Sequence, residues 1–269
     1  MIIDITHNNF KYQLNTDKTF DISIPYHFNK KQPNFYNVKP GTSSPLKENK
    51  KSYTVKSGAS CNVFEISMNI HCTGTHTEFV GHLLNDPGNI GKIVNEIFIP
   101  SLLISINPIP FANSKDSYHC NVEDNELIID KELIKASEKF ILKYKPKALI
   151  IRSYPNPNKK KYFNYQENIA PFFTNNALKY LSSIEIKHLV VDIPSIDRMD
   201  DDGLLGNHRL FWNYGREINE ELNEHSEKTI TEMTFIPNNI KDGFFFLNLQ
   251  IPHFVSDAAP SRPLLIKPN

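Results

Sequence analysis

The sequence predicts an α/β fold, with a mixed or parallel β core flanked by helices in a single domain over residues 1–269. Residues 148–152 (Ala-Leu-Ile-Ile-Arg) and 188–192 (His-Leu-Val-Val-Asp) form short, continuous apolar runs, as in strands buried on both faces. Residues 174–182, which have helical spacing, lie between them. Strand, helix and strand in this order indicate a parallel crossover unit. A chain of 269 residues with no internal repeat is long enough for one large domain.

The N-terminal half is expected to contain strands and one long loop. Residues 10–26 alternate as in a strand or hairpin, and residues 63–70 and 96–106 are also strand-like. Residues 29–51 are rich in Pro, Asn, Lys and Gly, which predicts a loop, and loops of this length often bind ligands. Phe35 in this loop is interpreted either as a substrate-binding aromatic or as a residue that pins the loop to the surface.

The C-terminal half supplies the helices and the remaining strands. Residues 130–142 have helical spacing, and Thr174 is a candidate N-cap for the helix over 174–182. The buried strands at 148–152 and 188–192 lie on either side of this second helix in the sequence. Residues 244–251 are expected to close the chain with a final strand.

Composition argues against several classes of function. Thirty basic and thirty acidic residues cancel, so neither nucleic acid nor a membrane surface is expected as a partner. Three cysteines argue against a disulfide framework and favour a reducing compartment. The N-terminus lacks the pattern of a signal peptide, and no run approaches the roughly 18 apolar residues that span a bilayer. We therefore expect a cytoplasmic protein.

One twelve-residue segment, 71–82, concentrates metal-binding and proton-transfer groups. It reads His71-Cys72-Thr73-Gly74-Thr75-His76-Thr77-Glu78-Phe79-Val80-Gly81-His82. In an extended chain, residues two apart point the same way, so Cys72, His76, Glu78 and His82 would share one side and His71 would be out of phase. Imidazole, carboxylate and thiolate together suit a divalent transition metal, with zinc the first choice and manganese or iron also compatible.

A second polar cluster follows the strand at 188–192. It contains Asp192-Ile193-Pro194-Ser195-Ile196-Asp197 and then Asn207-His208-Arg209. Ligand sites in open α/β sheets gather at the carboxyl ends of parallel strands, where this cluster is expected. The alternative is a capped turn beside a surface acidic run at 200–202.

Together these segments resemble the cyclase-like metal-dependent hydrolases, the family that includes bacterial kynurenine formamidases and isatin hydrolases. The family's His-x-Gly-Thr-His-x-Asp-x-Pro-x-His motif is matched by Cys72-Thr73-Gly74-Thr75-His76-Thr77-Glu78-Phe79-Val80-Gly81-His82. Further similar segments are Asp21-Ile22-Ser23, Ala148-Leu149-Ile150-Ile151-Arg152, Val191-Asp192-Ile193-Pro194-Ser195-Ile196-Asp197 and Asp257-Ala258-Ala259-Pro260-Ser261-Arg262-Pro263. The resemblance runs nearly end to end. It implies a swivelling β/β/α-like fold.

The resemblance also implies a two-metal site for hydrolysis of an amide or cyclic amide. By position, Cys72 or its neighbour His71, with His76 and Glu78, would hold the first zinc or manganese ion, and Glu78 would bridge to a second. The second ion would be held by His208 and by Glu232, with Glu220 as the alternative carboxylate. His82 corresponds to the general acid/base, and Phe35 to an aromatic that contacts the substrate. The family implies a small-molecule substrate and a homo-oligomer such as a homodimer.

Three departures from the motif affect how the family's residue roles apply to this sequence. Glu78 replaces Asp, Val80 replaces Pro, and Cys72 replaces the first His. The alternation of side chains along a strand favours Cys72 as the ligand. His71 would reach the same site if a bulge near Gly74 reversed this alternation, so both residues stay open as ligands. The altered ligand also motivates an alternative function, a non-catalytic relative that binds a small molecule or a single structural metal.

Overall fold

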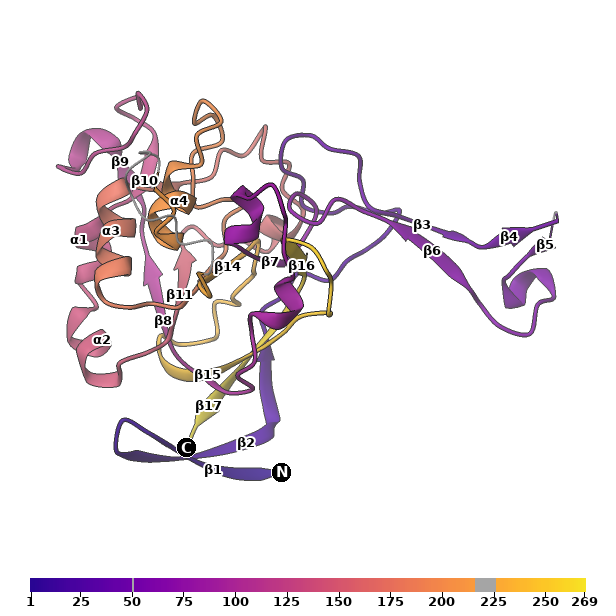
Figure 1. The fold of residues 1–269 in the computed structure, drawn as a ribbon, viewed down its shortest axis with the longest axis horizontal. Helices are drawn as coiled ribbons and strands as arrows, with labels where there is room; N and C mark the ends of the chain where they lie inside the picture. Colours follow the sequence, from indigo (N-terminus) through magenta and orange to yellow (C-terminus); the bar gives the residue numbers. More distant parts are fainter. Residues whose placement is uncertain (50, 216–225) are drawn as a thin grey trace.

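The body of the protein is a ten-stranded mixed sheet with helices packed on one face (Figure 1). The computed structural model describes residues 1–49, 51–215 and 226–269. The strand order is β1-β2-β17-β15-β8-β11-β13-β14-β7-β16. The strands of this sheet are β1 (Ile2–His7), β2 (Phe10–Asp21), β7 (His76–Phe79), β8 (Ile99–Ile106), β11 (Ala148–Ser153), β13 (His188–Val191), β14 (Thr229–Glu232), β15 (Gly243–Gln250), β16 (Ala258–Pro260) and β17 (Arg262–Pro268).

The centre of the sheet is parallel, because β8, β11, β13 and β14 run in the same direction. Leu149 and Ile151 of β11 pack into the core on the helix side, whereas Ile150 packs into a second core on the opposite face. Burial on both faces explains why β11 and β13 are continuously apolar. The antiparallel strands β15 and β7 flank this centre. The predicted mixed α/β fold is confirmed.

The helices are α1 (Lys131–Lys135), α2 (Glu138–Tyr144), α3 (Asn175–Ser183) and α4 (Gly206–Trp212). Thr174 caps α3 as predicted, because its side chain accepts a hydrogen bond from the backbone N–H of Ala177. The single helix predicted over 130–142 is instead two helices, since α1 ends before Ala136 and Ser137 precedes α2. Asp130 caps α1 by accepting from the backbone N–H of Leu133.

The expectation that residues 244–251 form the last strand was wrong. β15 is not the final strand, since β16 and β17 follow it. Pro260 lies in β16, which is at the edge of the sheet, where proline is tolerated. A small three-stranded sheet of β9 (Ile109–Pro110), β10 (Leu127–Ile129) and β12 (Phe172–Phe173) lies outside the main sheet.

A long arm, residues 42–67, projects from the body (Figure 1). It contains β3 (Thr42–Pro45), β4 (Lys47–Glu48), β5 (Lys51–Ser52), the short helix η1 (Val55–Ser57) and β6 (Phe64–Ser67). Residues 29–51 are therefore not entirely loop, and the strand expected at 63–70 is limited to β6, which pairs with β3. No helix within the described ranges is long and apolar enough to cross a membrane.

Candidate metal centre

The centre is built where β7 pairs with β14. His76 and Glu78 lie two residues apart on β7, so both side chains face the same side of the sheet. Glu232 is paired with His76 across the strands and therefore faces that side too. The intervening Thr77 faces the opposite side, where its hydroxyl lies 2.7 Å from the hydroxyl of Thr231. The strand register thus gathers two carboxylates and an imidazole at one place.

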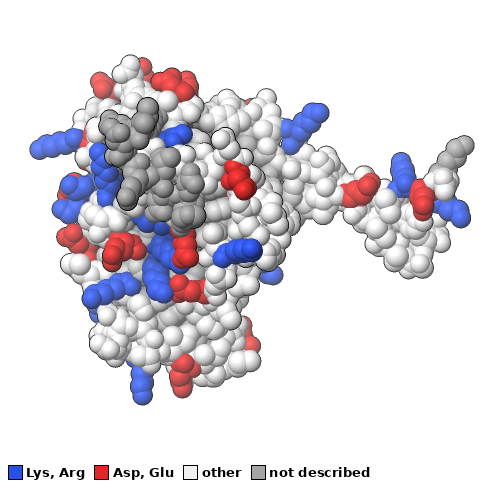
Figure 2. Space-filling view, in the orientation of Figure 1, with Lys and Arg blue, Asp and Glu red and all other residues white. Residues whose placement is uncertain are grey.

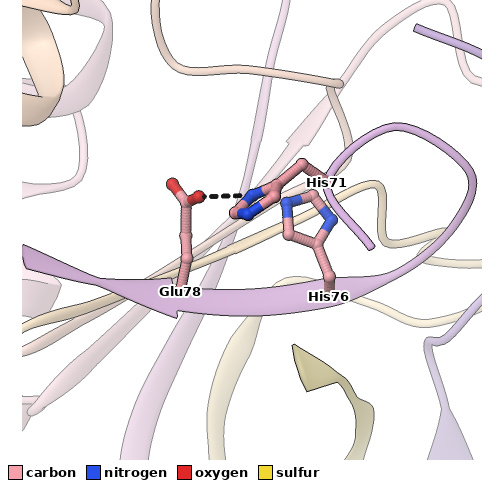
Figure 3. Close-up of side chains that lie close together, drawn as sticks. All are labelled: His71, His76 and Glu78. Atoms are coloured by element: carbon pink, nitrogen blue, oxygen red, sulfur yellow. Dashed lines mark hydrogen bonds and ion pairs between the residues drawn. The ribbon is translucent and has the colours of Figure 1, made fainter. Parts of the chain in front are cut away.

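His71 reaches the same place from a turn that precedes β7. Its Nδ1 lies 3.0 Å from Oε2 of Glu78 (Figure 3). The alternation of side chains expected for an extended chain, which would turn His71 away from Glu78, does not hold here. The strand begins only at His76, and residues 71–75 are not extended strand. Gly74 is needed in this turn, since a Cβ there would lie 2.4 Å from the ring of Tyr26.

Cys72 lies apart from these groups. It is 8% exposed and packs in an apolar cluster with Phe35, Met233 and Phe235. Burial, together with the charges of Glu232 and Glu78, raises the pKa of its thiol to about 11. His71, His76 and Glu78 place their ligand atoms within 4.8 Å of one another, and Cys72 is absent from that group and from the other ligand groups of the described residues. The geometry therefore favours His71 over Cys72.

A second group of ligands shares Glu78. Glu78, His208 and Glu232 also bring ligand atoms within 4.8 Å of one another, and all three are buried. His208 is carried by α4, and its Nε2 lies 2.9 Å from Oε1 of Glu78 and 3.7 Å from Oε1 of Glu232. Glu78 thus stands between two groups of ligands, as a bridging carboxylate would. Glu220 lies outside the described residues.

The hydrogen bonds of His76 leave one nitrogen available to a metal ion. Its Nδ1 donates to the backbone carbonyl of Gly74 at 3.0 Å, so a neutral His76 carries no proton on Nε2. This Nε2 is buried, has no hydrogen-bond partner among the described residues, and lies 3.6 Å from Oε2 of Glu232. Burial lowers the pKa of His76 to about 4, so the imidazole is neutral at neutral pH. A buried lone pair aimed at a carboxylate fits a metal cation between them.

His208 and His71 show the same arrangement. Nδ1 of His208 lies 2.7 Å from Oδ2 of Asp197, and Nε2 of His71 lies 3.0 Å from Oδ2 of Asp257. The other nitrogen of each ring faces an oxygen of Glu78. Metal-binding histidines characteristically have one nitrogen tied to an acceptor in this way.

The charges of the centre are those of a site that binds cations. Burial opposes protonation of His71, but hydrogen bonds to Asp257 and Glu78 outweigh it and raise its pKa to about 10. Burial likewise opposes protonation of His208, yet the charge of Glu78 and the hydrogen bond to Asp197 raise its pKa. Burial and the charge of Glu78 raise the pKa of Glu232. The protons that His71, His208 and Glu232 bind would lie where a divalent cation could bind in their place.

His82 lies beside this centre, on the short helix η2 (Val80–Leu83). Its Nδ1 lies 2.8 Å from Oδ2 of Asp257, and its ring centroid is 4.3 Å from that of His71. The side chain is 27% exposed, so solvent or a substrate can reach it. Asp257 was not among the residues assigned a role from the sequence. The only signal was its place at the start of the closing segment that resembles the family.

A third cluster of possible ligands, formed by His119, Asp197 and Asp201, is less suited to a metal. The side-chain amide of Asn207 donates to two backbone carbonyls, so its oxygen must accept from Nδ2 of Asn175. That Nδ2 also lies 3.0 Å from Nδ1 of His119, which must accept and so leaves the ring proton on Nε2. Since Nε2 faces the two carboxylates, a neutral His119 presents them with a proton rather than a lone pair.

Phe35 lies beside a cavity of about 160 Å³. The cavity also reaches Asp197, which contacts His208, and Ser195. Its remaining lining residues are mostly apolar and are Ile169, Ala170, Pro171, Phe172, Pro194, Met199, Glu126, Arg198 and Asp200. Phe35 is 5% exposed and its backbone N–H donates to the carbonyl of Cys72, so it also pins the loop. The two interpretations of Phe35 are thus compatible.

Comparison with known proteins places the chain in a family. The family model described as "Putative cyclase" matches residues 3–198. A kynurenine formamidase of Bacillus cytotoxicus is 25% identical over 161 residues, which are 60% of this chain and 65% of that protein. A predicted metal-dependent hydrolase from Bacillus stearothermophilus superposes with a TM-score of 0.58 and 17% identity, covering 93% and 98% of the two chains. Isatin hydrolase A from Labrenzia aggregata superposes with a TM-score of 0.61 and 14% identity, covering 94% of each chain.

The family match covers more than half of the chain, and the solved structures share its fold. It begins in β1, includes the whole of segment 71–82 and extends to residue 198, beyond the second buried strand. The resemblance drawn from the sequence is therefore confirmed, and the protein belongs to the cyclase family.

Proposed function

We propose that the protein is a metal-dependent hydrolase that cleaves an amide or cyclic amide of the formamide or lactam type. The observation that carries the proposal is the shared orientation of His71, His76 and His208. Each ring has one nitrogen bonded to an acceptor and the other directed at Glu78 or Glu232. A packed core does not require three histidines in this arrangement, whereas it is characteristic of histidines that bind metal ions.

In this proposal, the centre would bind two zinc or two manganese ions. His71, His76 and Glu78 would hold the first ion, and His208, Glu232 and the same Glu78 would hold the second. The bound ions would polarise a carbonyl and acidify a water molecule. Because His71 supplies an imidazole to the first site, the substitution at Cys72 does not leave that site short of a ligand, which favours the hydrolase over a non-catalytic relative.

His82 is proposed as the general acid/base. Its Nδ1 faces Asp257, so Nε2 is the nitrogen left to exchange protons with a reactant. The ring can take a proton from the attacking water and deliver it to the departing amine nitrogen, as general acid/base catalysis requires. Its place beside His71, with part of its surface exposed, supports this role.

The substrate is proposed to be a small molecule with an apolar ring next to the scissile amide. The cavity at Phe35 and Phe172 would hold the ring, because it adjoins Asp197 and hence the His208 side of the centre. The names of the relatives, a kynurenine formamidase and an isatin hydrolase, support an amide in a formylated or cyclic aryl compound.

Hydrolysis of a panel of N-formyl arylamines, isatin and lactams tests this proposal. Protein stripped with a chelator should be inactive and should regain activity with zinc or manganese. His82→Ala should lower kcat by roughly 100-fold or more, whereas His188→Ala, which removes a buried histidine outside the centre, should leave the rate of the folded protein unchanged. Activity that survives chelation, or an unchanged rate for His82→Ala, would contradict the proposal.

We also propose a homodimer, on the evidence of the projecting arm. Phe64 and Ile66 on β6 are 51% and 57% exposed, and an isolated two-stranded hairpin is only marginally stable in water. Figure 2 shows the arm standing clear of the body, with charges of both signs near its end. Light scattering should find a dimer for the wild type and a monomer for Phe64→Ser/Ile66→Ser, with Ile97→Ser, exposed on the body, as the control. A monomeric wild type would refute the dimer.

A further inference from the structure

Asp257 connects two histidines that have different proposed roles. Its Oδ2 lies 3.0 Å from Nε2 of His71 and 2.8 Å from Nδ1 of His82. Its Oδ1 accepts a hydrogen bond from the hydroxyl of Ser256 at 3.0 Å. The residue directly precedes β16, and its backbone carbonyl accepts from the N–H of Phe79 at the end of β7. The carboxylate is thus fixed against the strand that carries His76 and Glu78.

We propose that Asp257 is a positioning residue that orients both the metal ligand His71 and the acid/base His82. The inference rests on the proposed function and extends it by one residue. Both ring nitrogens lie within hydrogen-bond distance of one oxygen of this carboxylate, Oδ2. A carboxylate only accepts hydrogen bonds, and both ring nitrogens that face it must therefore carry protons.

This requirement fixes the remaining nitrogen of each ring. Nδ1 of His71 is directed at Glu78, where the first metal ion is proposed to bind. Nε2 of His82 is left for proton transfer. The two rings lie 4.3 Å apart and are tilted by 34°, so neither can turn freely without meeting the other. One carboxylate oxygen therefore sets the geometry of metal binding and of proton transfer together.

The positions of the two side chains show why such a carboxylate is needed. The side chains of His71 and His82 are 29% and 27% exposed, in contrast to the fully buried His76. His76 is held by the protein packed around it, whereas His71 and His82 border solvent and could rotate away. We therefore assign their orientation to Asp257.

Asp257→Asn tests the inference, because asparagine has nearly the same shape but lacks the negative charge that makes Oδ2 a strong acceptor for both rings. Zinc affinity should fall about 10- to 100-fold, the usual effect of losing a carboxylate behind a metal-bound histidine. At saturating metal, kcat should also fall by roughly 10-fold or more, with little change in KM, because His82 is no longer held. Asp257→Ser should show the same two losses. Ser256→Ala, which leaves Oδ2 intact, is the local control and should show neither loss.

A double-mutant cycle separates positioning from a general structural role. If Asp257 acts on kcat through His82, Asp257→Asn should change kcat by less than about twofold when His82 is already alanine. The inference would be overturned if Asp257→Asn lowered kcat in the His82→Ala protein as much as it does in the wild type. It would also be overturned by Asp257 variants that lose thermal stability but keep wild-type zinc affinity and kcat. Failure of the proposed function is a different result, namely a wild type that neither binds zinc nor hydrolyses the panel.

Discussion

Replacing His71 is expected to weaken metal binding far more than replacing Cys72, although the family motif aligns Cys72 with the metal ligand. His71→Ala removes an imidazole whose Nδ1 lies 3.0 Å from the shared carboxylate Glu78. Cys72→Ala removes a buried sulfur that packs against apolar side chains. The two neighbouring substitutions therefore act on different parts of the protein.

The magnitudes follow from these surroundings. His71→Ala removes one of the three protein ligands of the first site. Loss of a residue behind a ligand typically lowers metal affinity about 10- to 100-fold. Loss of the ligand itself should therefore lower the affinity by more than about 100-fold, which corresponds to at least about 2.7 kcal/mol. Cys72→Ala deletes a single buried atom and should cost about 1 kcal/mol of folding stability. Its metal affinity should stay within about threefold of the wild type, as expected for a residue outside the site.

Competition with a chromophoric zinc chelator measures both affinities, and thermal unfolding of the metal-free proteins measures stability. The expected pattern is a large loss of affinity for His71→Ala and a loss of stability alone for Cys72→Ala. If Cys72→Ala loses zinc affinity and His71→Ala keeps it, the thiol is the ligand and the assignment from the structure is wrong.

Three further predictions concern the surroundings of the centre. Gly74→Ala should destabilise the protein by about 1–3 kcal/mol in chemical denaturation, because its Cβ would lie 2.4 Å from the ring of Tyr26, and an unchanged midpoint would contradict this. Asp197→Asn should lower zinc affinity about 10- to 100-fold, since Asp197 holds Nδ1 of His208, and wild-type affinity would show that it does not. In metal-free protein, the pKa of His71 is raised to about 10. Its stabilising contribution should therefore be complete below the ordinary pKa of about 6.5 and lost as pH rises through about 10. The difference in unfolding free energy between wild type and His71→Ala should shrink over this range, and a difference independent of pH would refute the assignment.

The sequence predicted the centre of the fold because burial on both faces leaves a clear pattern. β11 and β13 are continuous apolar runs, and the capped helix α3 lies between them, so the parallel crossover could be predicted. β16 and β17 could not, because their prolines are compatible with strands only at positions that depend on their neighbours. In the arm, β6 falls within the strand expected at 63–70, whereas its partner β3 was missed because it is short and lies outside the core.

The candidate site was predicted unevenly for a similar reason. His76 and Glu78 lie on a strand, where a period of two determines their common direction. His71 lies in a turn, and its direction depends on packing such as the contact between Gly74 and Tyr26. Asp257 is 175 residues from His82 in the chain, and only the pairing of β16 with β7 brings the two together. Sequence periodicity holds no information about such a contact.

The metal content of the purified protein tests the central claim most directly. After removal of metal and dialysis against zinc or manganese, elemental analysis should find about two ions per chain for the wild type. His76→Ala should hold fewer ions, whereas His188→Ala, which also lacks a buried histidine, should match the wild type. Folded wild-type protein with less than roughly half an ion per chain would contradict the account.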